Sequence, residues 1–217
     1  GVPLSVWLLN ETTELGIFEA GISEMGEMEA LQSIIRPTVG VLTNIGGAHQ
    51  ENFYSVPDKC MEKLTLFKEC DVVIYDGDNE LISSCVGKSL FGAREIAWSK
   101  TDNERPLYIS SIEKGETSTT IRYRYLGMPN EYTIPFIDDA SIENSLHCLA
   151  VCLYMMLPAE KITERMAHLE PIAMRLEVKE GKNGCVLIND SYNSDLASLD
   201  IALDFMSRRS EDKGRKR

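Results

Sequence analysis

Strand-like and helix-like segments alternate through the first hundred residues, and this alternation constrains the fold more than any other feature. Runs of β-branched and other apolar residues such as VGVLTNIG and DVVIYD are typical of buried strands. The expected strands are 16–20, 39–46, 71–76 and 95–98, and the expected helices are 24–35, 57–68 and 79–86. Because such alternation forms a mainly parallel sheet flanked by helices, the sequence predicts an α/β fold.

The pattern changes near residue 105, where apolar and polar residues begin to alternate between glycine-containing turns. This alternation predicts antiparallel strands of a small side sheet at 106–113, 118–126 and 131–136. Helices are expected again at 141–156 and 158–169, followed by a strand pair at 177–181 and 185–190 and a helix at 195–206. We interpret 1–207 as one domain and 208–217 as a basic linker.

Charge and composition exclude several classes of function. The net charge is −12, and because the last ten residues carry +4, the remainder carries −16. A body this acidic repels phosphate backbones, which argues against nucleic acid as the main partner. No apolar run approaches the roughly 20 residues of a membrane helix, so no membrane insertion is expected. The six cysteines form no CxxC pair, which favours reduced thiols in the cytoplasm.

Three side chains are candidates for metal binding. Glu19 ends the expected strand 16–20, and His49 lies in the loop after the next strand. Ligands collect outside the carboxyl ends of strands in open α/β sheets, so these two residues could bind Mg²⁺. Lys63 lies one residue off the apolar stripe of its helix, where it could face a cleft. The alternatives are a helix-capping glutamate, a surface histidine and a lysine whose ammonium reaches solvent.

Three further residues are candidates for nucleotide binding. Asp190 ends an apolar strand before a polar loop, where it could contact ribose hydroxyls, or it could form a simple turn. Arg175 could pair with a phosphate in a bidentate manner, or with Glu177 at the surface. Asn144 lies near the start of a helix, where its amide could contact a purine edge or cap the helix.

Taken in order, six segments resemble the central, ATP-binding domain of the Mur ligase family. They are FEAGISEMGEM, RPTVGVLTNIGGAHQENF, EKLTLF, IENSLHCLA, MRLE and NDSYNSD. The likeness covers nearly the whole chain, and the LTNIG–His and DSYN segments are the most specific. Within the family, it is closest to the branch that adds D-alanyl-D-alanine to UDP-N-acetylmuramoyl-tripeptide. The resemblance implies a fold of the phosphate-loop type and the formation of an amide through an acyl phosphate.

The resemblance also implies roles for individual residues. Glu19 and His49 match the metal-binding residues of the family, and Lys63 matches the lysine that becomes carbamylated. A carbamate is anionic and could hold a second Mg²⁺. Asn144 matches the asparagine near the adenine of ATP. Arg175 matches the arginine at the phosphates, and Asp190 the aspartate at the ribose.

The sequence departs from the family pattern in several places. It contains no glycine-rich phosphate loop ending in Gly-Lys-Thr/Ser, so we expect a piece of a longer ligase that is inactive alone. His147 replaces the second asparagine of the adenine motif, and Ser194 and Asp195 replace the usual residues after DSYN. Such variants suggest a form fused to an alanine racemase. The alternatives are a folylpolyglutamate synthase-like ligase and a non-catalytic module that retains the fold.

Overall fold

The computed structural model describes residues 1–47, 49–89, 92–172, 175–192 and 196–211. The chain divides into two compact units, residues 1–167 and residues 168–217. The predicted boundary between 207 and 208 falls within the last helix of the second unit, α7 (Leu196–Glu211). The assignment of 1–207 as one domain and 208–217 as a linker stays a prediction.

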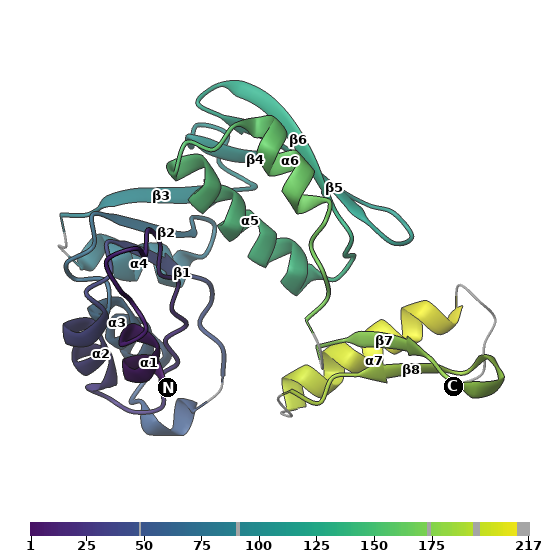
Figure 1. Ribbon diagram of the computed structural model, residues 1–217, viewed down its shortest axis with the longest axis horizontal. Coiled ribbons are helices and arrows are strands. Elements are labelled where there is room, and N and C mark those ends of the chain that lie inside the picture. Colours follow the sequence, from purple (N-terminus) through teal and green to yellow (C-terminus); the bar gives the residue numbers. More distant parts are fainter. Residues whose placement is uncertain (48, 90–91, 173–174, 193–195, 212–217) are drawn as a thin grey trace. The chain divides into compact units, whose positions relative to one another are not determined.

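A six-stranded sheet forms the centre of the first unit, with the strands in chain order β1 to β6 (Figure 1). The first three pairings along it are parallel and the last two are antiparallel. The strands are β1 (Val39–Leu42), β2 (Val72–Asp76), β3 (Arg94–Ser99), β4 (Leu107–Lys114), β5 (Thr119–Tyr125) and β6 (Met128–Ile134). The predicted mainly parallel α/β fold is therefore confirmed.

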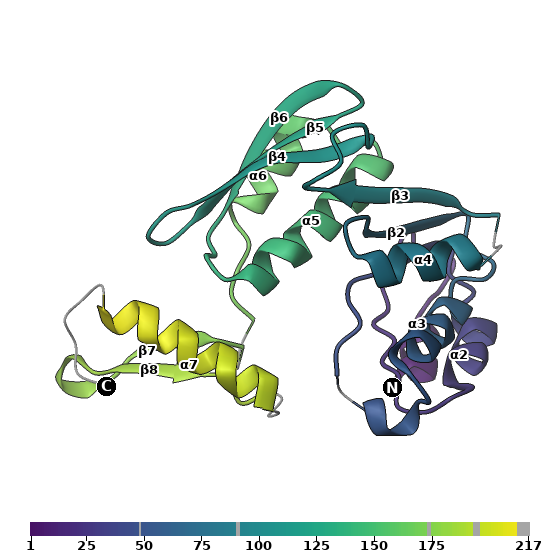
Figure 2. The same ribbon diagram turned by 180° about the vertical axis from the view of Figure 1, so that it is seen from behind.

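Helices cover both faces of this sheet. Figures 1 and 2 show α5 on one face of the parallel strands, α4 on the other face, and α6 beside the antiparallel strand β6. The helices of the first unit are α1 (Val2–Val6), α2 (Glu27–Ile35), α3 (Val56–Thr65), α4 (Glu80–Lys88), α5 (Asp139–Tyr154) and α6 (Ala159–Met166), with a 3₁₀ turn, η1 (Gln50–Asn52). The bounds of α2 to α6 agree with the predicted helices to within a few residues, whereas α1 and η1 were not predicted.

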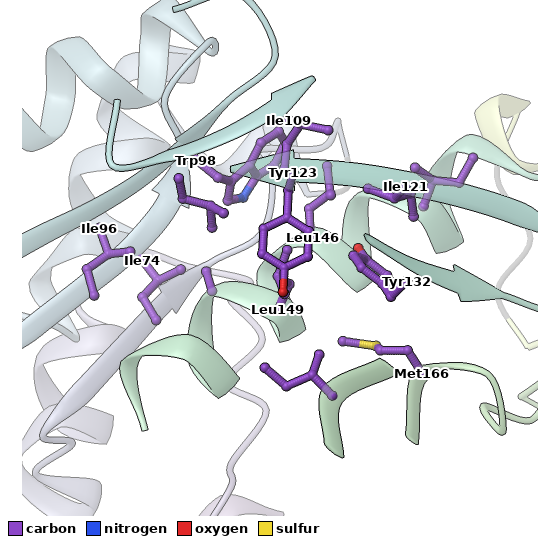
Figure 3. Packing of buried hydrophobic residues seen from close by; sticks show 14 of the residues in the cluster. Ile74, Ile96, Trp98, Ile109, Ile121, Tyr123, Tyr132, Leu146, Leu149 and Met166 are labelled. Atoms are coloured by element: carbon purple, nitrogen blue, oxygen red, sulfur yellow. The ribbon is translucent and has the colours of Figure 1, made fainter. Parts of the chain in front are cut away.

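Side-chain alternation along β2 explains why both faces are covered. Val72 and Ile74 pack into a cluster with α5 and α6, whereas Val73 and Tyr75 pack into a second cluster with α2, α3 and α4. A strand buried on both faces needs apolar residues at every position, which is the run that the sequence shows. In the first cluster, Tyr132 lies edge-on to Tyr123, with ring centroids 6.0 Å apart (Figure 3).

Two sequence predictions for the sheet need correction. The segment 16–20 forms no strand, and in the described chain its backbone pairs with no strand of the sheet. Apolar character alone does not make a strand, because the backbone N–H and C=O groups also need a partner. The antiparallel strands 107–134 do not form a separate side sheet. They extend the main sheet, because β4 pairs with β3 through Leu107 and Tyr108.

The second unit contains the small antiparallel sheet. Its strands β7 (Glu177–Glu180) and β8 (Val186–Asn189) pair across a short 3₁₀ turn, η2 (Lys182–Gly184), as the sequence predicts. The last helix is α7 (Leu196–Glu211). Its predicted first residue, Asp195, lies outside the described residues, as does Ser194.

Gly40 brings β1 unusually close to α3 and the turn that follows it. A Cβ atom at Gly40 would lie 2.5 Å from the ring of Phe67, well inside van der Waals contact. Only glycine therefore permits this approach. The contact places β1 beside the turn that follows the helix carrying Lys63.

Candidate functional site

Lys63 lies on α3 beside the core, as its position off the apolar stripe predicts. The helix is capped by Ser55, and Cys60 and Leu64 on its inner face are buried. Lys63 itself is half-buried, and its Nζ donates to the backbone carbonyl of Asn44 over 3.2 Å. Its ammonium therefore contacts the loop that follows β1 and leads to His49.

A second lysine, Lys59, contacts the same loop and was missed in the sequence. It lies one helical turn before Lys63, is only 2% exposed, and donates from Nζ to the carbonyl of Gly46 over 2.8 Å. Its Nζ also lies 5.6 Å from the centre of the Phe53 ring. Lys59 could have been recognised from its spacing, because two residues that are four apart lie on the same side of a helix.

The pKa of Lys63 is lowered by the same surroundings. Burial is the main cause, because it disfavours the charged ammonium, and the positive charge of Lys59 adds to it. A lowered pKa increases the fraction of neutral amine, which is the form that acts as a nucleophile. Lys63 is therefore better prepared to react with an electrophile such as CO₂ than a surface lysine.

His49 is exposed and has a left-handed backbone, with φ of 57°, at the start of η1. It interacts electrostatically with Glu27. The backbone N–H groups of Ser23 and Glu24 lower the pKa of Glu27, and His49 adds a smaller effect in the same direction. Beside His49, the side-chain oxygen of Gln50 is buried, and no donor in the described chain lies within hydrogen-bond distance of it. Such an atom is available to a ligand donor or a cation.

Glu19 does not lie at the end of a strand. It is exposed in an irregular segment, and no contact among the described residues joins it to His49 or Lys63. The alternative of a helix-capping glutamate is also wrong, because α2 begins eight residues later, at Glu27. The described residues contain no group of three or more His, Cys, Asp or Glu side chains arranged to hold a metal. The role of Glu19 as a metal ligand therefore stays a prediction.

Asn144 and His147 lie one turn apart on α5 but have different surroundings. Asn144 is exposed, and Asp138 rather than Asn144 caps the helix, by accepting from the backbone of Ser141. His147 is 3% exposed and contacts two protein groups, Trp98 and the backbone of Thr43. Of the two positions in the adenine motif, only Asn144 is therefore open to a ligand.

Arg175 and Asp190 come together in the second unit. Asp190 Oδ1 accepts from the backbone N–H of Leu176 over 3.0 Å, beside Arg175. The Arg175 guanidinium lies 4.4 Å from the centre of the Tyr192 ring. The pairing of Glu177 with Asn189 in the two strands places these residues at one end of the small sheet. The sequence did not predict a role for Tyr192.

Comparison with known proteins identifies the family of this chain. The family model described as the Mur ligase middle domain matches residues 1–152. The chain belongs to the Mur ligase family. The resemblance found in the sequence is therefore confirmed at the family level. No helix among the described residues has the length and apolar character to cross a membrane.

A curated relative of known name is similar over most of this chain. The UDP-N-acetylmuramoyl-tripeptide–D-alanyl-D-alanine ligase of Bacillus subtilis is 30% identical over 210 residues, which is 94% of this chain and 43% of that protein. The chain thus spans less than half the length of this relative.

Two solved Mur ligase structures share the fold. MurF from Acinetobacter baumannii has a TM-score of 0.74 at 18% identity, covering 87% of this chain and 41% of that chain. MurF from Thermotoga maritima, solved in complex with ADP, has a TM-score of 0.69 at 18% identity, covering 86% and 43%.

Proposed function

We propose that this chain is the nucleotide-binding part of an ATP-dependent ligase that adds D-alanyl-D-alanine to UDP-N-acetylmuramoyl-tripeptide in the cytoplasm. The observation that carries the proposal is the contact between Lys63 and the loop after β1, in a chain of the Mur ligase family. The relative from Bacillus subtilis bears the name of this ligase. Six free cysteines suit a reducing compartment.

In the proposed reaction, a carboxylate oxygen of the tripeptide attacks the γ-phosphorus of ATP, and the bond to the bridging oxygen breaks as ADP leaves. The amine of D-alanyl-D-alanine then attacks the acyl carbon. A C–N bond forms, phosphate leaves, and the nitrogen loses a proton. Bringing two anions together is the main electrostatic obstacle, which bound Mg²⁺ would reduce by neutralising charge.

Lys63 would take part as a carbamate. Its neutral amine attacks the carbon of CO₂, a C–N bond forms, one C=O electron pair moves to oxygen, and a proton leaves the nitrogen to solvent. Burial of Lys63 favours the neutral amine that this step requires. The product exchanges a cation for an anion beside the carbonyl of Asn44, so the ammonium contact seen here would have to be released.

The donor set is compatible with Mg²⁺, which uses few protein ligands and completes its coordination with water and phosphate oxygens. Glu19, His49 and carbamylated Lys63 would hold it, and the unpartnered oxygen of Gln50 is an additional donor next to His49. Two metal sites are expected in the longer enzyme. Among the nucleotide residues, Asn144 would contact adenine, Arg175 the phosphates and Asp190 the ribose.

The test is an assay of the longer natural protein that includes a phosphate loop, with ATP, Mg²⁺, bicarbonate and both substrates. We expect phosphate release and the new amide only with the tripeptide and D-alanyl-D-alanine. Lys63→Arg keeps the charge but cannot supply a neutral amine, so it should abolish turnover. Lys68→Arg, at an exposed pair with Glu29, is the matched control and should retain it.

Two alternatives give different results in this assay. A folylpolyglutamate synthase-like ligase would use folate and glutamate instead, and it is the weaker alternative because the named relative is a D-alanyl-D-alanine ligase. A non-catalytic module would show no Mg²⁺-dependent nucleotide binding by calorimetry. For the 217 residues alone, we expect little or no turnover, because their sequence lacks the phosphate-loop lysine and its backbone donors.

A further inference from the structure

His147 lies between two protein groups that occupy both nitrogens of its ring. The indole N–H of Trp98 donates to Nδ1 over 3.2 Å, and Nε2 lies 3.1 Å from the carbonyl oxygen of Thr43. Because an indole nitrogen can only donate, Nδ1 must accept, and the proton of the neutral ring resides on Nε2. His147 therefore donates to the carbonyl of Thr43 from a single defined tautomer.

The surroundings hold this ring firmly. The rings of Trp98 and His147 meet edge to face, with centroids 5.3 Å apart, and Trp98 is fully buried. Figure 3 shows Trp98 in the same cluster as Leu146 and Leu149 of α5. Burial also lowers the pKa of His147 to about 4, which keeps the ring neutral near pH 7. A neutral ring is what the hydrogen bond from Trp98 requires.

The acceptor of this bond belongs to a loop that is held by three side chains from two helices. After β1 ends at Leu42, the carbonyls of Thr43, Asn44 and Gly46 accept from His147, Lys63 and Lys59 in that order. His147 supplies the first of these contacts, directly after the strand. It is also the contact that comes from α5, since both lysines lie on α3.

We propose that His147 is a positioning residue that holds the loop at 43–47, and through it His49, instead of contacting the nucleotide base. The role of His147 in holding the loop follows from its contacts with Trp98 and Thr43. The effect of His147 on a metal at His49 rests on the proposed function. A base contact would require His147 to break one of its two hydrogen bonds inside the core, where an unpaired polar group is costly. Asn144, one turn earlier and exposed, can contact a ligand without that cost.

Two substitutions separate the two hydrogen bonds of His147. His147→Gln has the length to place an amide N–H near the position of Nε2 and so to reach the Thr43 carbonyl. His147→Asn has an oxygen near the position of Nδ1 and can accept from Trp98, but it is too short to reach Thr43. The proposal therefore requires the glutamine variant to retain the loop and the asparagine variant to loosen it, although asparagine is the residue of the family.

The primary measurement is amide hydrogen exchange, followed by mass spectrometry, over 43–47 in the 217-residue chain. We expect exchange in His147→Gln to stay close to that of the wild type and exchange in His147→Asn to rise about fivefold, the effect of one lost hydrogen bond. Ile162→Val, in the same core cluster but on α6, controls for general destabilisation and should leave the loop unchanged. Equal exchange in the two His147 variants would overturn the proposal.

The second measurement is binding of Mn²⁺, used as a spectroscopic probe for Mg²⁺, in the longer natural protein. Weaker Mn²⁺ binding in His147→Asn than in His147→Gln supports the link to His49. If the wild type binds no Mn²⁺, the proposed function fails, and the order of exchange rates still decides the role of His147. Tighter ATP binding in His147→Asn than in the wild type would indicate a base contact at this position and would also overturn the proposal.

Discussion

Asp190 accepts a hydrogen bond from the backbone N–H of Leu176, so the segments that carry Arg175 and Asp190 are joined directly. Leu176 has a left-handed backbone, with φ of 46°, a conformation that is unfavourable for a leucine. The carboxylate thus stabilises the strained residue that follows Arg175. Asp190 has a structural role in addition to any contact with ribose.

Substitution of Asp190 should therefore change the stability of the chain in the absence of any nucleotide. Asp190→Ala removes the acceptor and should destabilise the chain by about 1 kcal/mol, whereas Asp190→Asn keeps an oxygen at that position and should cost less. Urea unfolding followed by circular dichroism measures both. Equal losses of stability in the two variants would show that the bond to Leu176 contributes nothing.

Tyr192 should influence the affinity for nucleotide through Arg175. The guanidinium lies 4.4 Å from the centre of its ring, and Tyr192 is 53% exposed, so the cation–π interaction is a solvent-exposed one. Tyr192→Leu removes the ring, and the lost cation–π interaction is worth about 0.5–1 kcal/mol. We therefore expect ADP to bind roughly two- to fivefold more weakly in the longer protein. Tyr192→Phe keeps the ring and should bind ADP like the wild type. A similar loss in both variants would assign the effect to the hydroxyl group.

The fold could be predicted well where the pattern is local. Strand β2 and helix α3 follow from an apolar run and from a proline near a helix start, and both lie within a few residues of the predicted bounds. The joining of β4 to β3 could not be predicted, because it depends on only two paired positions, at the end of β3 and the start of β4. The segment 16–20 was misassigned because its sequence does not reveal whether a neighbouring strand exists.

The candidate site could also be predicted only where it depends on a local sequence pattern. Lys63 was found from its position beside the apolar stripe, and Arg175 and Asp190 meet because the predicted strand pair exists. Lys59 lies at the same offset from the apolar stripe as Lys63, one turn earlier, but its burial depends on contacts with Gly46 and Phe53 that the sequence does not show. The sequence shows that His147 replaces the second asparagine of the adenine motif. It does not show the contacts of His147 with Trp98 and Thr43, because these residues are distant in sequence.

The close approach of Gly40 to Phe67 predicts a large effect from one methyl group. Gly40→Ala would place a Cβ atom 2.5 Å from the ring, and overpacking of this kind costs about 1–3 kcal/mol. Gly87→Ala is a matched control, because a Cβ there meets nothing within 4 Å and alanine favours a helix. We expect thermal unfolding to show a lower midpoint for Gly40→Ala and an equal or higher one for Gly87→Ala. Recovery of stability in Gly40→Ala combined with Phe67→Leu would locate the clash at the ring.

The buried ring of His147 predicts how stability depends on pH. Burial lowers its pKa from 6.5 to about 4, so between these values the unfolded chain binds more protons than the folded one. Stability should consequently fall as pH decreases from 6.5 towards 4, and it should level off below that range. His147→Gln lacks the titrating ring but retains the bond to Thr43, so it should lack this component of the pH dependence.

The comparison of the wild type with His147→Gln isolates the effect of the ring. The difference between their free energies of unfolding should change by up to about 3 kcal/mol between pH 6.5 and pH 4, as measured by urea unfolding. Asp76 and Glu143, whose pKa values are raised mainly by burial, are present in both proteins and cancel in the difference. A difference that stays constant from pH 7 to pH 4 would mean that the folded chain accommodates the charged ring as well as water does.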